Sequence, residues 1–262
     1  MNNTGMPRSA PSPVRRAQLA ALPEFDVNLI HYAAGHSQSR HDHSRASFAV
    51  VIAGSLTEEV DGREHAAGPG QASLKPSQVV HSDRYGRDGA LLLSFVFRCE
   101  ETAERAVGQR GWKWRHVRSA APVLATNMFR EVPCTALNDL LWDCLAATDR
   151  HAPAEHPPAW LCWAKSELDR RTCPTEIAEL AKDAGVHRVH FSREFVRHYG
   201  FAPSVYRQRQ MTGRALNALL HDRLPAAAAA QEAGFVDQSH LARAIRSGFG
   251  TTPRRMAALF GG

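Results

Sequence analysis

Short apolar runs separated by turn residues dominate the first hundred residues. β-prone runs occur at Val27–Tyr32, Ser47–Ile52 and Leu91–Phe97. The turn signals that separate them are Gly35, Gly54, Asp61-Gly62, Gly68-Pro69-Gly70 and Asp88-Gly89. Strand-length runs spaced by about 8–12 residues are typical of a small barrel or sandwich. We therefore expect an all-β unit from Phe25 to Arg98.

The pattern becomes helical from about Glu100. Apolar residues then recur at i, i+3, i+4, i+7 and i+8, namely Leu137, Leu140, Leu141, Cys144 and Leu145. This stripe either packs on its own domain or serves dimerisation. His151–Pro158 contains three prolines, which cannot continue a helix, and it is the best candidate for a linker. A second helical region begins at Trp160.

These patterns predict an α+β chain of two domains. We expect a disordered tail over residues 1–22, a β-barrel with following helices over 23–150, a proline-rich linker over 151–158 and an all-α domain over 159–262. The N-terminus lacks an apolar signal segment, and no apolar run approaches the roughly 18 residues of a membrane helix. The five cysteines are scattered, which favours reduced thiols. The prediction is a soluble, cytoplasmic protein without membrane association.

The net charge of +6 is concentrated in one part of the chain. Residues 160–262 carry 15 basic and 9 acidic residues, whereas residues 1–159 carry 17 of each. Of those 15 basic residues, 13 are arginine. An arginine-rich basic part beside a neutral part favours a module that faces nucleic acid, although a merely solvated basic surface has the same composition.

The C-terminal region contains an internal repeat. At an offset of 50 residues the matches are Phe191/Leu241, Arg193/Arg243, Phe195/Ile245, Gly200/Gly250 and Pro203/Pro253. At an offset of 49, Ala181-x-x-Ala184-Gly185 matches Ala230-x-x-Ala233-Gly234. The pattern of each unit predicts a helix, a turn at glycine and a second helix that ends at glycine. A proline then begins the next helix. Two such helical hairpins are either packing units or DNA-reading helix-turn-helix motifs.

The second helix of each unit has two distinct faces. In the first unit Phe191 and Phe195 are expected inside, and Val189, Ser192, Arg193 and Val196 form an outward stripe. In the second unit Leu241 and Ile245 are expected inside, and Ser239, Ala242, Arg243 and Arg246 form the outward stripe. Small residues allow close approach to a groove, and arginine can donate two hydrogen bonds to guanine. Asp237 is the expected N-cap of the second unit, and His187 is a poorer cap in the first.

The stretch from Trp160 to Gly262 resembles the DNA-binding domain of AraC/XylS-type transcriptional regulators. The residues that carry the resemblance are Leu180-Ala181 to Gly185, His190-Phe191-x-Arg193-x-Phe195 to Gly200-x-x-Pro203, and Gly234-Phe235-x-Asp237-Gln238-Ser239-His240-Leu241-x-Arg243 to Gly250-x-x-Pro253. The resemblance implies two helix-turn-helix units joined by a long helix, here Pro203–His221, with their recognition helices in successive major-groove segments. RNA polymerase is a partner implied by the same resemblance.

By motif position, the resemblance implies base contacts from Val189, Ser192, Arg193, Gln238, Ser239, Ala242 and Arg243. Arg188, Arg197 and Arg246 are candidates for phosphate contacts, which position a protein without reading sequence. The chain departs from the usual pattern at His187, where serine is common, and at Ala226–Ala230, where larger aliphatic residues are usual. Because alanine buries little area, we expect the second unit to be the less firmly packed.

Histidines in the β region form a second candidate site. His41-Asp42-His43 places two imidazoles on one face of an extended segment, and His81 follows the turn Lys75-Pro76-Ser77-Gln78. With Gly54, this resembles the metal-binding motifs of a cupin barrel, but the carboxylate expected near Ser47 is absent. The three histidines either bind a divalent metal such as zinc, line an effector pocket, or are structural. His31 and His65 are expected at the surface or in packing, and Glu58 and Glu59 in solvent.

The leading hypothesis is a sequence-specific transcriptional regulator, not an enzyme, with a cupin-like sensor barrel. Its expected partners are double-stranded DNA, an unknown small-molecule effector and a second copy of the chain. The alternatives are a metal-dependent cupin enzyme with an appended DNA-binding domain and a non-specific DNA-binding protein. No cofactor follows with certainty from the sequence. A G-x-S-x-G elbow, a P-loop or a Cys/His dyad is not evident.

Overall fold

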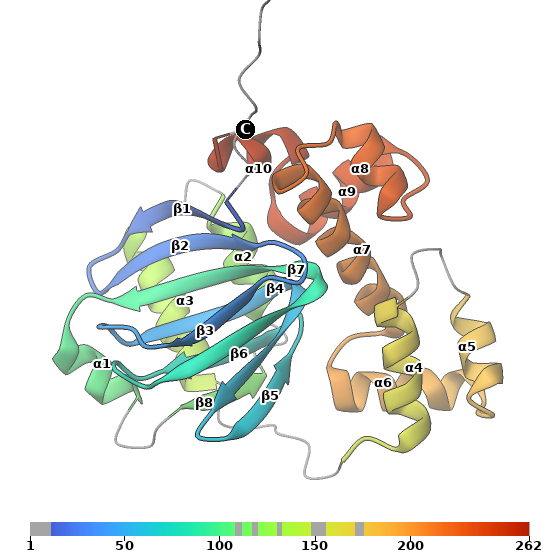
Figure 1. Ribbon diagram of the computed structural model, residues 1–262, viewed down its shortest axis with the longest axis horizontal. Helices are drawn as coiled ribbons and strands as arrows, with labels where there is room; N and C mark the ends of the chain where they lie inside the picture. The colour runs from blue at the N-terminus through green and yellow to red at the C-terminus, as the bar shows by residue number, and fades with distance from the viewer. Residues whose placement is uncertain are drawn as a thin grey trace, which may run out of the picture.

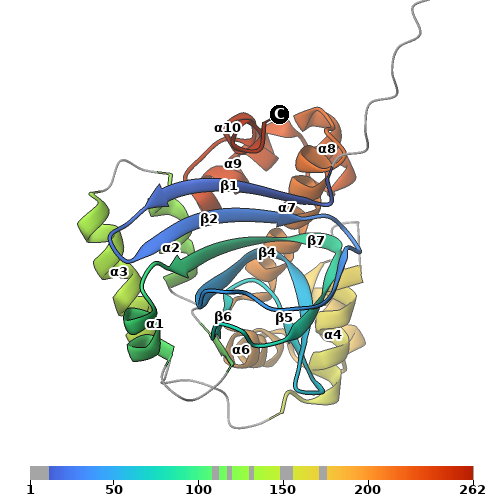
Figure 2. The same cartoon turned by 60° about the vertical axis from the view of Figure 1, so that its left-hand side comes forward.

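The computed structural model describes residues 12–107, 112–116, 120–129, 133–147, 156–170 and 176–261. Its N-terminal part is an antiparallel sheet that curves around a buried interior (Figures 1 and 2). The strands are β1 (Val14–Ala21), β2 (Phe25–Tyr32), β3 (Ser37–His41), β4 (Ser47–Val60), β5 (Arg63–Ala67), β6 (Gln71–Lys75), β7 (His81–Phe97) and β8 (Lys113–His116). The main path is β1-β2-β7-β4-β6-β8, while β3 pairs with β7 and β5 with β4.

The other regular elements of the described chain are helices. Three of them follow the barrel: α1 (Glu100–Val107), α2 (Ala120–Asn127) and α3 (Cys134–Ala147). The C-terminal region contains α4 (Ala159–Arg170), α5 (Ile177–Asp183), α6 (Arg188–Tyr199), α7 (Pro203–Leu220), α8 (Ala226–Glu232), α9 (Gln238–Phe249) and α10 (Pro253–Leu259). The predicted α+β architecture, with a barrel followed by an all-α region, is confirmed.

Successive side chains of the central strands point to opposite sides of the sheet. Both sides are buried, because one faces the barrel interior and the other is covered by helices. Ile30 and Leu92 belong to a cluster that faces the barrel interior. Their chain neighbours Leu29 and Leu91 belong to a larger cluster on the outer face, where helices cover the sheet. Alternation along β2 and β7 therefore builds two cores, one inside the barrel and one between the sheet and the helices.

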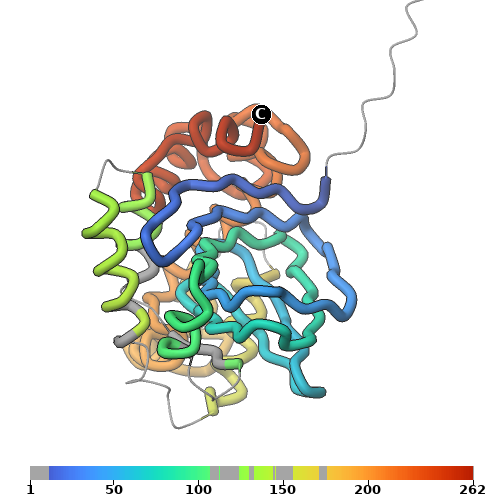
Figure 3. The backbone as a smooth tube through the Cα atoms, turned by 90° about the vertical axis from the view of Figure 1, so that its left-hand side faces the viewer, coloured from blue at the N-terminus to red at the C-terminus, as the bar shows by residue number. Residues whose placement is uncertain are grey.

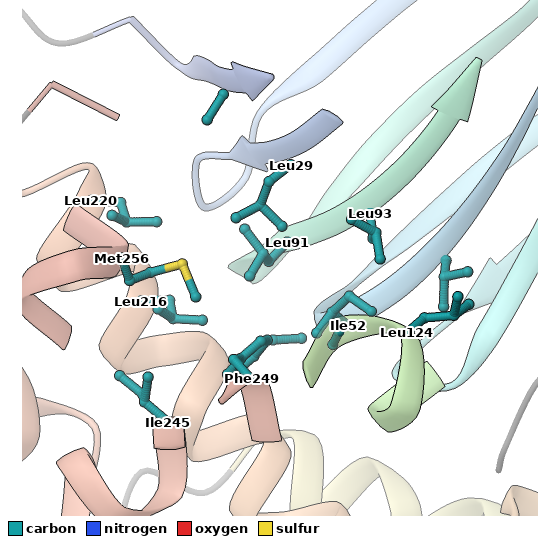
Figure 4. Close-up of a cluster of buried hydrophobic side chains, with 14 of the residues drawn as sticks. Leu29, Ile52, Leu91, Leu93, Leu124, Leu216, Leu220, Ile245, Phe249 and Met256 are labelled. Atoms are coloured by element: carbon teal, nitrogen blue, oxygen red, sulfur yellow. The ribbon is translucent and has the colours of Figure 1, made fainter. Parts of the chain in front are cut away.

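The outer core joins the barrel to the C-terminal helices. Figure 4 shows side chains of the sheet, such as Leu91 and Ile52, facing Leu216 of α7 and Phe249 of α9. Each of Leu216, Ile245 and Met256 is fully buried. Figure 3 shows α8, α9 and α10 lying along the β1–β2 end of the sheet. The second helix-turn-helix unit and the barrel thus share one continuous hydrophobic core.

The alanine run does not leave the second unit loosely packed. Ala229 and Ala230 are fully buried in the shared core. The small side chains allow α8 to lie close to α7 and α9, and α7 in turn packs on β4 and β7 of the barrel within the same core. The expectation of weaker packing is therefore wrong, because the sequence pattern does not reveal that the barrel covers this unit.

The predicted disordered tail is wrong over residues 14–21. β1 pairs antiparallel with β2, in a register that places Val14 opposite Tyr32, and Ala17 is buried. The strand lacks a strong alternation of large apolar residues, so its structure depends on the hydrogen-bonding edge of β2. Residues 1–11 and 151–155, which include most of the predicted linker, lie outside the described residues.

The helical stripe of α3 packs on its own domain. Leu137 and Leu141 are buried in the outer core, and Leu140 and Leu145 are partly buried against it. On the same helix, the Trp142 indole donates a hydrogen bond of 2.6 Å to Glu24. The stripe is thus used for intramolecular packing, the first of the two alternatives; the side chain of Cys144 lies outside the described residues.

Candidate nucleic-acid interface and histidine cluster

The first helix-turn-helix unit consists of α5 and α6. Gly185 provides the turn between them with a positive φ of 69°, which glycine adopts without steric cost. His187 caps α6, since its Nδ1 accepts a hydrogen bond of 3.3 Å from the backbone N–H of Val189. Gly200, in the left-handed conformation, ends the helix.

The second unit repeats this geometry with α8 and α9. Gly234 provides its turn and Gly250 ends its second helix. The predicted N-cap is confirmed, because the Asp237 carboxylate accepts a hydrogen bond of 2.6 Å from the backbone N–H of His240. This bond is shorter than the His187 cap of the first unit, as the residue types predict.

The faces of α6 and α9 are those that the repeat predicts. Phe191, Phe195, Leu241 and Ile245 are fully buried. Arg193 and Arg243 are exposed at equivalent positions of the two helices. Within the part of the chain that the structure describes, neither arginine has an ion-pair partner.

The remaining predicted base-contacting residues are also accessible. Val189, Gln238 and Ser239 are exposed, and Ser192 and Ala242 are partly exposed. The three predicted phosphate-contacting residues, Arg188, Arg197 and Arg246, are exposed as well. Arg197 lies 3.6 Å from the carboxylate of Glu194 on the same helix and forms an exposed ion pair with it.

The connector helix α7 separates the two units. Figure 1 shows α5 and α6 at one end of α7, and α8 and α9 at the other. Polar contacts fix α7 to the barrel: the Asn217 side-chain oxygen accepts a hydrogen bond of 3.0 Å from Ala34 N–H, and Arg214 lies 3.4 Å from Asp88. Arg15 of β1 donates to the backbone carbonyls of Leu220 and Phe260 at the ends of α7 and α10. The position of the second unit is therefore determined partly by the barrel.

Strand pairing brings the three predicted histidines together. His41 at the end of β3 is the register partner of His81 at the start of β7. Their ring centroids are 4.3 Å apart, and the His43 ring lies 5.0 and 5.1 Å from the rings of His41 and His81. One ligand atom from each imidazole lies within 4.8 Å of the others. The three histidines singled out in the sequence thus lie together in the structure. Three imidazoles are a donor set that suits zinc-like ions.

The surroundings of the cluster favour the neutral form of two imidazoles, those of His43 and His81. Burial lowers the pKa of His43 to about 4, helped by the positive charge of Lys75. Burial also lowers the pKa of His81. A neutral imidazole has an unprotonated nitrogen, which is the form that binds a metal.

Three buried charged residues near the cluster were not recognised in the sequence. Glu58, expected in solvent, is fully buried and paired with Lys75 of β6. Burial raises the pKa of Glu58 to about 7, and the Lys75 ammonium opposes that rise. Asp83 is 3% exposed and lies opposite Glu58 on β7. The signal that could have identified Asp83 is its spacing from His81, since residues two apart on a strand share one face.

The cluster adjoins a cavity in the barrel interior. Its volume is about 200 Å³, and its lining includes Tyr32, His43, Lys75, Asp83 and Tyr85. The rings of Tyr32 and Tyr85 stack with centroids 3.9 Å apart and form one wall. The cavity therefore combines aromatic surface with both signs of charge, as small-molecule sites often do.

Comparison with known families agrees with this geometry. A helix-turn-helix domain model matches residues 180–258, and a cupin domain model matches residues 28–93. The chain joins a cupin domain to an AraC-type helix-turn-helix domain. This AraC-type organisation is that of a transcriptional regulator. Among the described residues, no helix is long and apolar enough to cross a membrane. No curated protein sequence matches the chain.

Solved structures similar to parts of this chain come from several bacteria. A protein of unknown function from Rhizobium leguminosarum is 22% identical, with a TM-score of 0.32, over 34% of this chain and 86% of its own. KdgF from Halomonas sp. is 19% identical, with a TM-score of 0.31, over 39% of this chain and 96% of its own. ToxT from Vibrio cholerae is 11% identical, with a TM-score of 0.38, over 91% of this chain and 100% of its own.

Proposed function

We propose that the two recognition helices read one DNA site and that the barrel binds a small-molecule or divalent-metal effector. The observation that carries the DNA part is the exposure of Arg193 and Arg243 at equivalent turns of α6 and α9. In a major groove each guanidinium donates two hydrogen bonds to a guanine, while small neighbours such as Ser192 and Ala242 let the helix approach the bases. Arg188, Arg197 and Arg246 contact phosphates and set the register.

The shared core supplies the coupling between the effector and DNA binding. Ile30 and Leu92 belong to the cluster inside the barrel, while the adjacent Leu29 and Leu91 pack in the outer core. A ligand that shifts β2 or β7 from inside therefore moves the surface on which α7 and the second unit rest. Because α7 joins the two units, such a shift changes the spacing of the recognition helices. The expected output is an effector-dependent change in affinity for the DNA site.

His41, His43 and His81 are the residues that would hold a metal. A divalent ion bound there would supply a positive charge and a coordination position next to the cavity. His43 belongs both to the cluster and to the cavity lining, so a metal bound at the cluster would affect ligand binding in the cavity through this residue. A second copy of the chain and RNA polymerase are further partners in this proposal.

The deciding experiment is binding-site selection from random DNA with the full chain. The full chain is used because removal of the barrel would expose Leu216, Ile245 and Phe249, which are buried in the shared core. We expect one recurrent site containing two separated groups of selected bases. The variant Arg193→Ala/Arg243→Ala should lose this site and keep weak binding to random DNA. Recovery of no common sequence by the unaltered chain would exclude sequence-specific reading.

A metal-dependent enzyme is the second candidate, because the histidine cluster adjoins a cavity. Metal analysis of the purified chain tests the two hypotheses that require a metal, the metal-dependent enzyme and the metal sensor. A protein that acquires no stoichiometric transition metal, even after incubation with zinc, contradicts both, and leaves a metal-free effector pocket. A metal-loaded protein in which the metal changes DNA affinity supports the sensor.

A further inference from the structure

We propose that Asp83 completes the histidine cluster as its fourth donor, so that one divalent cation is bound by three imidazoles and this carboxylate. This inference rests on the part of the proposed function in which the cluster is the ligand site of the sensor. The carboxylate expected near Ser47 is absent from the sequence, and Asp83 supplies one from a different strand.

The backbone fixes the orientation of two imidazoles. His41 Nδ1 lies 2.8 Å from the carbonyl oxygen of Ser39, and His81 Nδ1 lies 2.9 Å from that of Val79. A carbonyl can only accept, so each Nδ1 carries a proton, and in the neutral ring each Nε2 then presents a lone pair. Both Nε2 atoms are buried and have no hydrogen-bond partner among the described residues. This tautomer and its carbonyl partner are typical of histidines that bind metals through Nε2.

Asp83 lies close to two of the three imidazoles. Its Oδ2 atom is 3.7 Å from His41 Nε2 and 3.8 Å from His81 Nε2. These distances are longer than hydrogen bonds. Metal–ligand bonds of about 2.0–2.1 Å at tetrahedral angles separate neighbouring ligand atoms by about 3.4 Å. Both distances from Asp83 are therefore close to the separation of two ligand atoms around one cation.

The charge around Asp83 points to the same conclusion. The carboxylate is 3% exposed, and its Oδ1 has no hydrogen-bond partner in the described part of the chain. The buried Lys75 attracts Asp83, but it is paired directly with Glu58. Two buried carboxylates, Glu58 and Asp83, thus share one ammonium, and a divalent ion between Asp83 and the imidazoles would compensate the remaining negative charge.

The test measures metal binding by the full chain after treatment with a chelator. The probes are Co²⁺, whose visible absorption is strong in tetrahedral coordination, and Zn²⁺ as the competitor. The unaltered chain should bind one Co²⁺ with a tetrahedral spectrum. Asp83→Asn should weaken Zn²⁺ affinity at least about 10-fold. The matched control is Asp42→Asn, which makes the same change at an exposed residue between His41 and His43 and should have no effect.

A donor replacement guards against loss of folding in Asp83→Asn. Asp83→Cys places a thiolate at the same position, so its Co²⁺ complex should gain a sulfur-to-cobalt charge-transfer band in the near ultraviolet. A folded Asp83→Cys protein that binds Co²⁺ without this band overturns the inference, as does an Asp83→Asn protein with unchanged affinity. Both outcomes leave intact the proposal that His41, His43 and His81 alone bind the metal. If the unaltered chain binds neither metal, the inference and the metal sensor fail together, while site selection on DNA still tests the regulator.

Discussion

Gly213 of α7 lies directly against Gly54 of β4. A Cβ atom added to Gly213 would come 2.9 Å from the backbone nitrogen of Gly54, closer than non-bonded atoms tolerate. Gly54 is itself in a positive-φ conformation at 73° and packs against the backbone of Gly89. The connector helix and the barrel therefore meet backbone to backbone, and this contact fixes their separation.

This contact predicts the effect of a single methyl group. Gly213→Ala should destabilise the protein by about 1–3 kcal/mol, because the backbone of Gly54 cannot rotate out of the way. The matched control is Gly248→Ala in α9, where an added Cβ meets nothing within 4 Å. That variant should be stabilised by up to about 1 kcal/mol, since alanine favours helix over glycine. Chemical denaturation of both variants measures the difference; equal stabilities would show that the contact yields without cost.

Base reading and phosphate binding can be separated on one helix. Arg243→Ala should cost roughly 1–3 kcal/mol on the selected site and relax preference at one base position. Arg246→Ala, one turn along α9, should weaken binding to selected and random DNA by the same factor, because phosphates carry no sequence information. Titrations on both DNAs distinguish the two residues. Equal weakening of both DNAs by Arg243→Ala would assign that residue to the phosphates.

Salt dependence measures the number of phosphates that the regulator neutralises. If roughly 6–10 phosphates are contacted, affinity should fall about 10³–10⁵-fold between roughly 50 and 200 mM salt. The triple variant Arg188→Ala/Arg197→Ala/Arg246→Ala should reduce the slope of log affinity against log salt by about 3. An unchanged slope in the triple variant would remove these arginines from the phosphate contacts.

Acid should destabilise the junction between β2 and the C-terminal helices through His31. Burial, assisted by the charges of His221 and Arg15, lowers the pKa of His31 from 6.5 to about 3. Between these values the unfolded chain binds a proton that the folded chain does not, so stability falls as pH decreases below 6.5. The expected loss from His31 alone is about 2 kcal/mol at pH 5.

The variant His31→Leu isolates this contribution. Other histidines also take up protons on unfolding, so the relevant quantity is the difference between the variant and the unaltered chain. Urea denaturation at pH 7.5 and pH 5 should show a smaller acid-induced loss in His31→Leu, by about 2 kcal/mol. The same loss in both proteins would mean that His31 is protonated in the folded state.

Local features were determined by the sequence alone. Gly185, Gly234, Gly200 and Gly250 mark the turns and helix ends because only glycine adopts their positive φ without strain. Asp237 caps α9 through a bond three residues away, and the 50-residue repeat places Arg193 and Arg243 on equivalent turns. The pair His41 and His43 was likewise evident from its spacing. Each of these relationships acts within a few residues of the chain, where periodicity and steric preference decide the outcome.

Tertiary structure decided the relationships that depend on strand register and on contacts between distant segments. β1 forms because β2 offers an edge, which the sequence of β1 does not reveal. Asp83 lies beside the histidines and opposite Glu58 because β3 and β4 pair with β7 in fixed registers, and the fold also brings Glu58 to Lys75 of β6. The barrel also covers the alanine-rich second unit, for which local pattern predicted weak packing. A one-residue change in register would turn each of these side chains to the opposite face of the sheet, so only the folded chain determines which charges and cores meet.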